Sequence, residues 1–187
     1  MDASVAAILG AAIGAVGGVG GGLLTLSTQL RSLDAQHRAE EKRWLADLRR
    51  ETYTGFVTCA KQLSNAVWKA SDLLHAEGGV EDWESARCSV HDAWTQFSAA
   101  SAAVTMAGPH AVAAAAEDLR EALRQWELLT GTWIRAAIQQ GTGRLAEHDR
   151  QFMAGFEAKK PLEVAFQVAA RRALLTSARW GDSVRTS

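Results

Sequence analysis

The 187-residue sequence has few of the residue types that mark an irregular or cross-linked chain. It contains two prolines and two cysteines, while 48% of its residues are hydrophobic. A chain this apolar and this poor in proline can bury a core, which excludes an intrinsically disordered protein. Cys59 and Cys88 lack the spacing of a disulfide framework or a zinc site, so we expect two reduced, buried thiols.

The chain also lacks an excess of either charge. Its 20 Lys and Arg residues nearly balance its 21 Asp and Glu residues, and the formal net charge is −1. Nucleic-acid-binding domains generally carry a clear basic excess, because they must neutralise phosphates. We therefore expect no nucleic-acid partner.

The motifs of common catalytic and cofactor sites are missing. The chain has no phosphate-binding glycine loop, no HExxH, no GxSxG and no repeated ExxH. Asp72-x-x-His75 and Cys88-x-x-His91 have ligand-type side chains one helical turn apart, but about 12 Å of helix rise separates the two histidines across the turn between them. We expect no metal, no cofactor and no catalytic residue; the rival hypothesis is a soluble enzyme with an unrecognised site.

What the sequence does have is a long uncharged segment near its amino terminus. No charged residue occurs in the 24 positions from Ala3 to Leu26, and a helix of that length reaches about 36 Å, enough to cross a bilayer core of about 30 Å. We predict a transmembrane helix over 1–28. A secretory signal peptide would need a basic start, and a Gly/Ala-rich tail is the third alternative.

Basic residues follow this segment and none precedes it, which by the positive-inside rule places the amino terminus outside and residues 30–187 in the cytoplasm. The predicted location is the cell membrane, with a single pass and the lipid bilayer as a partner. Residues 29–43 mix both charges and predict a solvated juxtamembrane stalk rather than a lipid-binding patch.

Four glycines of the uncharged segment recur at every fourth position: Gly10, Gly14, Gly18 and Gly22. On a helix they form one smooth groove that lets two membrane helices approach closely. This spacing favours homo-oligomerisation through the transmembrane helix. It also supplies the alternative function, an oligomeric glycine-zipper pore or toxin-like effector.

Beyond Thr28 apolar residues recur at spacings of three and four, which is the period of a helix. The first helix is expected to run to His75 with a core stripe of Leu45, Leu48, Thr52, Phe56, Cys59, Leu63, Val67, Ala70 and Leu74. Gly78-Gly79, Gly108-Pro109 and Gly141-Thr142-Gly143 predict breaks, with Asp82 capping the second helix.

After the third break we expect a helix over 144–159, a kink or restart at Pro161, and a last helix over 161–180. The prediction is an all-α chain whose transmembrane helix continues into an antiparallel bundle of four or five helices over 44–180, with a flexible tail over 181–187.

Seven tryptophans are present, and most fall on the predicted core stripes. Trp44 and Trp180 are the two most favoured for exposure, so they are candidate anchors for a protein partner. Arg49, Arg50 and Tyr53 are further candidates for a partner surface, against the alternative of an ordinary solvated helix face.

The chain resembles a loose group of uncharacterised actinobacterial membrane-anchored helical proteins. The resemblance rests on Glu41-Lys42-Arg43-Trp44, Arg49-Arg50-Glu51-Thr52-Tyr53, Phe56, Ala107-Gly108-Pro109, Val112 and Ala115-Ala116. It implies an amino-terminal membrane helix with a cytoplasmic helical bundle and brings no activity. The function expected from the sequence is a non-enzymatic interaction or scaffold module for an unknown protein partner.

Overall fold

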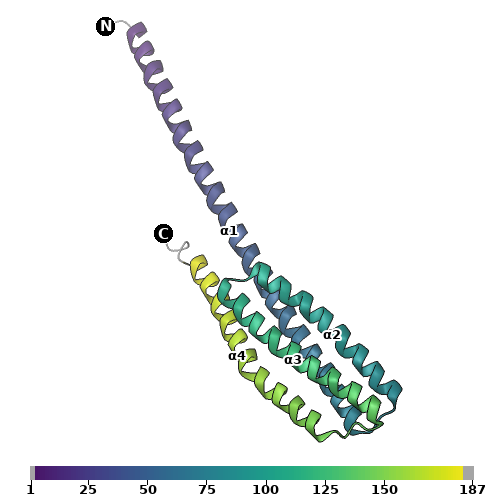
Figure 1. The fold of residues 1–187 in the computed structure, drawn as a ribbon. Helices are drawn as coiled ribbons and strands as arrows, with labels where there is room; N and C mark the ends of the chain where they lie inside the picture. The colour runs from purple at the N-terminus through teal and green to yellow at the C-terminus, as the bar shows by residue number, and fades with distance from the viewer. Residues whose placement is uncertain (1–2, 183–187) are drawn as a thin grey trace. The chain divides into compact units, whose positions relative to one another are not determined.

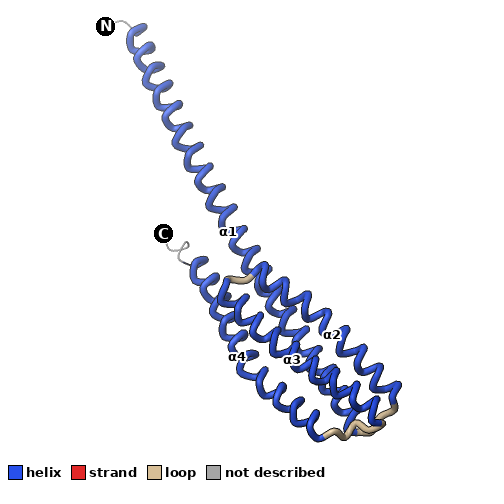
Figure 2. The backbone as a smooth tube through the Cα atoms, in the orientation of Figure 1, coloured by secondary structure: helices blue, strands red, loops and turns tan. Residues whose placement is uncertain are grey.

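The structure is a computed structural model that describes residues 3–182, with the side chains of 36–38 and 40–176. Four helices occupy these residues: α1 spans Ala3–His75, α2 Val80–Ala107, α3 His110–Gln140 and α4 Ala146–Asp182 (Figure 1). Short loops join them, and the described part of the chain contains no strand (Figure 2). The all-α prediction is confirmed, with four helices in the bundle.

The chain divides into two compact units, Met1–Leu45 and Ala46–Ser187. The first unit holds the amino-terminal part of α1. The second holds the rest of α1 together with α2, α3 and α4, which pack side by side as an antiparallel bundle (Figure 1). The predicted tail over 181–187 lies mostly outside the described residues, because only its first two positions belong to α4.

The core-facing stripe of α1 alternates spacings of three and four along the bundle. It consists of Tyr53, Phe56, Ala60, Leu63, Val67, Ala70 and Leu74. The predicted stripe is confirmed at Phe56 and from Leu63 onward, but Leu45, Leu48, Thr52 and Cys59 are only half-buried. Tyr53 and Ala60 are buried instead, because they lie fourteen and seven residues before Val67 and so continue its seven-residue repeat.

Aromatic rings from all four helices meet in this core. Phe56 of α1 lies 4.4 Å from Phe166 of α4 and 5.0 Å from Phe97 of α2, measured between ring centroids. Trp68 of α1 lies 6.1 Å from Trp126 of α3 in an edge-on arrangement, a favourable geometry for two π systems.

The two cysteines are less buried than expected. Cys59 is half-buried on α1, and Cys88 is exposed on α2. Both are free thiols, as the sequence predicts. The expectation of burial is wrong for Cys88 because the core face of α2 passes through its neighbours Ala86 and Val90.

Three of the predicted breaks, at Gly78-Gly79, Gly108-Pro109 and Gly141-Thr142-Gly143, are confirmed. At the first, Gly79 and not the predicted Asp82 is the N-cap of α2; Asp82 lies in the first turn, where its Oδ2 accepts a hydrogen bond from the backbone N–H of Gly79 at 3.1 Å. Pro109 precedes the first residue of α3, where its missing N–H costs no helical hydrogen bond. Gly141 ends α3 with a φ of 71°, a left-handed conformation that glycine adopts without steric penalty.

The predicted restart of the chain at Pro161, with separate helices over 144–159 and 161–180, is wrong: α4 runs through this residue. Pro161 is exposed, so the carbonyl that loses its helical hydrogen bond can be hydrated. The Lys159 ammonium and the Glu163 carboxylate, 3.2 Å apart, bridge the turn around the proline. Phe152 and Phe166 are buried on either side, so both halves of the helix pack against the core.

Candidate functional site

An apolar groove of about 540 Å³ lies between α1 and α4 of the bundle. We call it the α1/α4 groove. Its α1 wall is made of Arg50, Tyr53, Thr54, Val57, Thr58 and Lys61, and its α4 wall of Phe166, Gln167, Ala170, Arg171, Leu174 and Leu175. These segments cover about three helical turns on each side, or roughly 14 to 16 Å.

The floor of the groove is apolar and belongs to the core of the bundle. Phe166 is fully buried, and its ring meets Tyr53 edge-on with the centroids 6.2 Å apart. Val57 and Leu174 are half-buried beside it, while Leu175 at the rim remains 56% exposed. A leucine this exposed next to a buried aromatic floor leaves apolar area that a ligand can cover.

The rim of the groove is positively charged. Arg50, Lys61 and Arg171 lie on it, and none of the lining residues is an aspartate or glutamate. Arg50 has a carboxylate neighbour, Asp47 at 3.3 Å, in a pair exposed on both sides. Lys61 and Arg171 are exposed and make no ion pair within the part of the chain that the structure describes. Their charges are therefore available to a ligand.

A second hollow lies along the adjoining face of α1 and has a different character. Asp47 and Glu51 line it together with Arg50, Gly55 and Cys59. Its charges are mixed and no aromatic residue lines it, so it lacks the uniform charge sign and the aromatic floor of the α1/α4 groove.

The predicted partner-surface residues on α1 separate in the structure. Arg50 is exposed on the groove rim. Arg49 is half-buried, and its Nε donates to the carbonyl of Ala107 at 3.1 Å, so it fixes the α2–α3 turn onto α1. Tyr53 is 4% exposed and belongs to the core instead of a surface patch, although the side of its ring contributes to the groove.

The hydroxyl of Tyr53 is the one buried side-chain polar atom without a hydrogen-bond partner among the described side chains. Burial raises the pKa of this phenol, and the nearby Arg49 charge opposes the shift. The hydroxyl faces Gly108 at the α2–α3 turn: a Cβ added to that glycine would lie 3.3 Å from it.

The other predicted site residues lie elsewhere. Trp44 belongs to the amino-terminal unit and is 62% exposed. Trp180 and the four glycines Gly10, Gly14, Gly18 and Gly22 fall outside the described side chains. In the portion that the structure describes, no helix is both long enough and apolar enough to traverse a membrane.

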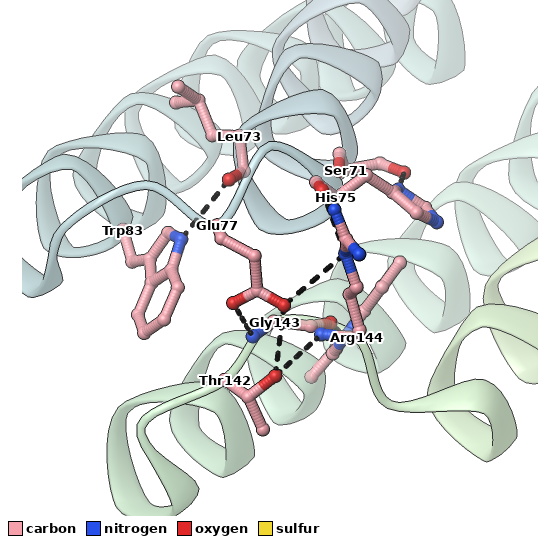
Figure 3. Close-up of polar contacts among 9 residues, drawn as sticks. Ser71, Leu73, His75, Glu77, Trp83, Thr142, Gly143 and Arg144 are labelled. Carbon is pink, nitrogen blue, oxygen red and sulfur yellow. Dashed lines mark hydrogen bonds and ion pairs between the residues drawn. The ribbon is translucent and has the colours of Figure 1, made fainter.

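The end of the bundle far from the groove's Arg50 is closed by a polar junction between two loops. The Glu77 carboxylate accepts hydrogen bonds from the Thr142 hydroxyl at 3.0 Å and from the backbone N–H of Gly143 at 3.1 Å (Figure 3). Nε of Arg144 lies 3.4 Å from the same carboxylate. The hydrogen bond from the Gly143 N–H is the largest cause that lowers the pKa of Glu77; desolvation, the next largest, opposes it, and Thr142 and Arg144 lower the pKa further.

Neighbouring contacts extend this junction. Nε2 of His75 lies 3.3 Å from Oδ1 of Asp149, and the indole N–H of Trp133 donates to the carbonyl of Gly143 at 2.8 Å. The indole N–H of Trp83 donates to the carbonyl of Leu73 at 3.3 Å (Figure 3). Each of these polar groups is paired with another group of the bundle, so the junction joins the loops rather than offering a ligand site. Across the described residues, no group of three or more His, Cys, Asp and Glu side chains could hold a metal ion.

The α4 wall of the groove, including Arg171, Leu174 and Leu175, was not predicted from the sequence. The pattern that could have revealed it is the surplus of apolar residues on this helix. Beyond its core positions, Val164 and Val168 are exposed as well as Leu175. A helix more apolar than its core face requires indicates a second contact surface.

Comparison with known proteins gives no relative: no protein-family model, no curated protein and no solved structure matches this chain.

Proposed function

We propose that this chain is a non-enzymatic interaction module whose helical bundle binds a protein partner and is attached to a membrane by the uncharged segment Ala3–Leu26. The observation that supports binding is the α1/α4 groove, with its apolar floor and a rim of one charge sign. Protein interfaces commonly combine a desolvated apolar centre with a polar rim in this way.

The bundle offers a stable base for such a surface. The groove lies over Phe166 and Phe56, which are fully buried with ring centroids 4.4 Å apart, so its floor is part of the main core. Because the walls are helices rather than loops, the groove is preformed, and binding requires little ordering of the protein.

The composition of the amino-terminal segment supports membrane attachment. The absence of charge over 24 positions is typical of spanning helices, and basic residues follow it. In this proposal the bundle lies in the cytoplasm.

Attachment is tested by alkaline extraction of membranes from cells that produce the full chain. We expect the protein in the membrane pellet, and Ile13→Asp with Val16→Asp should release it, since each central charge costs about 3 kcal/mol of insertion. The matched control, Gln36→Asp with His37→Asp, places the same charges at exposed positions of α1 and should stay in the pellet. An unaltered chain in the supernatant would contradict membrane attachment.

Partner binding is tested by photo-cross-linking in intact cells. A photoreactive residue replaces Thr54 or Leu175 on the groove, and Cys88 or Arg135 on the outer faces of α2 and α3 as controls. We expect a discrete protein adduct from the groove positions and none from the controls. Equal adducts from all four positions, or none from the groove, would contradict the interaction function.

A further inference from the structure

We infer that the occupant of the α1/α4 groove is an amphipathic helix of a partner protein that carries acidic residues on both sides of its apolar stripe. The inference rests on the proposed interaction function and adds the chemistry of the partner.

The shape of the groove fits a helix. Its walls are α1 and α4, which run antiparallel in the bundle (Figure 1). Its length corresponds to about three helical turns. Amphipathic helices bind such grooves through apolar residues at spacings of three and four. Small or short side chains, Thr54 and Thr58 on α1 and Ala170 on α4, line the groove and let a third helix approach closely.

The apolar stripe of the partner would cover the half-buried floor and the exposed rim. Val57 and Leu174 are packed against the core on one side only, and Leu175 keeps more than half of its surface exposed. Burying such residues supplies the main part of the binding free energy in helix-in-groove complexes.

The positive charges on the groove rim indicate that the partner helix carries negative charges. Lys61 and Arg171 stand on opposite walls, both exposed and without an ion pair among the described side chains, and no carboxylate lines the groove. A helix with glutamates on both flanks of its stripe would meet a cation on each wall. A helix with lysines there would face repulsion on both sides, which makes charge the source of specificity.

The nearest carboxylates lie off this path. Asp47 and Glu51 line the adjoining hollow on α1, and Asp47 is paired with Arg50. On α4, Glu163 is paired with Lys159. Of the three, only Glu51 has no ion pair among the described side chains, so it would repel an acidic helix displaced toward the adjoining hollow.

The test measures fluorescence anisotropy of two synthetic helical peptides with the full chain in an uncharged detergent. Both peptides share one leucine stripe over about four turns, and one carries glutamates where the other carries lysines. We expect the acidic peptide to bind at least about tenfold more tightly, and its affinity to fall as salt is added.

The variant Lys61→Glu with Arg171→Glu should weaken binding of the acidic peptide at least about tenfold and strengthen binding of the lysine peptide. The matched control, Arg87→Glu with Arg135→Glu, makes the same charge change at exposed positions of α2 and α3 and should leave both affinities within about twofold. Circular dichroism verifies that both variants retain their helices.

Equal affinity for the two peptides, or an acidic-peptide affinity that the groove variant does not change, would overturn the inference. So would binding of phosphatidylglycerol vesicles, or self-association of the chain, that the groove variant abolishes while neither peptide binds. Groove adducts in cells without any binding of the acidic peptide would overturn the partner chemistry and leave the interaction function standing.

Discussion

The backbone N–H of Gly143 donates to Oε2 of Glu77 at 3.1 Å, although 66 positions separate the two residues in the sequence. This bond joins the α1–α2 loop to the α3–α4 loop. Glu77 has a φ of 53°, a left-handed conformation that costs a non-glycine residue about 1 kcal/mol or more. The contacts of its carboxylate with Gly143, Thr142 and Arg144 offset this strain.

The Glu77 carboxylate should make the stability of the bundle sensitive to acid. Its pKa in the folded state lies below the ordinary value of 4.5, so its contribution is complete above that pH and is lost as the pH falls toward the folded pKa. At neutral pH, Glu77→Gln should therefore unfold at lower urea concentration than the unaltered chain. We expect this difference to shrink as the pH is lowered below about 4.5.

Urea titrations followed by circular dichroism at several pH values measure this difference. Glu84→Gln is the matched control, because Glu84 is an exposed carboxylate near the start of α2 that takes no part in the contacts described for the loop junction. Its difference from the unaltered chain should be small at every pH. A Glu77→Gln difference that stays constant from neutral to acidic pH would contradict the role given to Glu77.

Gly143 is required for close approach between the same two loops. A Cβ at this position would lie 2.1 Å from the carbonyl oxygen of Leu74, a backbone atom that cannot move independently. Gly143→Ala should destabilise the bundle by about 2 to 3 kcal/mol, the upper part of the range that is usual for overpacking, as measured by urea unfolding.

Gly131 gives the opposite expectation for the same substitution. It lies inside α3, and nothing stands within 4 Å of the position that a Cβ would take. Gly131→Ala should raise the free energy of unfolding by about 0.5 to 1 kcal/mol, because alanine favours the helix. If the two variants lost similar stability, the contact between Gly143 and Leu74 would not explain the effect at 143.

The helices and turns of the bundle could be predicted from the sequence because each rests on local chemistry. Gly78-Gly79, Gly108-Pro109 and Gly141 interrupt apolar periods whose length and spacing are helical, and the structure has loops at all three positions. The continuity of α4 could not be predicted this way. Packing of Phe152 and Phe166 on both sides of Pro161 overrides the local preference for a break.

The groove could be predicted only in part, because it depends on which residues of α1 face α4. The predicted core stripe of α1 passes through positions 52 and 59, whereas the observed stripe passes through 53 and 60. Because of this one-residue difference, Tyr53 lies in the core rather than on the surface, while Arg50 lies on the groove rim. Lys61 and Arg171 are 110 positions apart, and only the pairing of the two helices brings them to one groove. No local pattern in either segment encodes that pairing.

Tyr53→Phe should stabilise the bundle. The hydroxyl is buried without a partner among the described side chains, so removing it relieves a desolvation cost and leaves the ring in contact with Phe166. We expect a gain of about 0.5 to 1.5 kcal/mol in urea unfolding. Thr130→Val is the control, since the buried Thr130 hydroxyl donates to the carbonyl of Trp126 and its removal should bring no gain.

Pro161→Ala should also stabilise the bundle, because it restores a helical N–H inside α4. A proline inside a helix destabilises the folded state by about 3 kcal/mol. It also restricts the unfolded chain, which offsets up to about 1 kcal/mol of that loss. We expect a net gain of about 1 to 2 kcal/mol in urea unfolding. The exposed neighbour Ala165 provides the reverse test: Ala165→Pro should lose at least as much as Pro161→Ala gains. No gain from Pro161→Ala would mean that the turn is optimised around the proline.

Removing the charge of Lys159 and removing the charge of Glu163 should change the stability of the bundle by different amounts. The Lys159 side chain is 8% exposed and its ammonium lies 5.5 Å from the centroid of the Trp126 ring, whereas Glu163 is 31% exposed and can be hydrated. Glu163→Gln leaves a buried cation without its counter-ion, and we expect a loss of about 1 to 2 kcal/mol in urea unfolding.

Lys159→Met removes the buried charge instead and keeps an apolar chain of similar length against the Trp126 ring. The unpaired Glu163 carboxylate then turns to water, so stability should stay within about 1 kcal/mol of the unaltered chain. The order of the two variants is the decisive observation. If Lys159→Met lost more stability than Glu163→Gln, the ammonium itself would be stabilising α4, through its contacts with Trp126 and Phe156, beyond its pairing with Glu163.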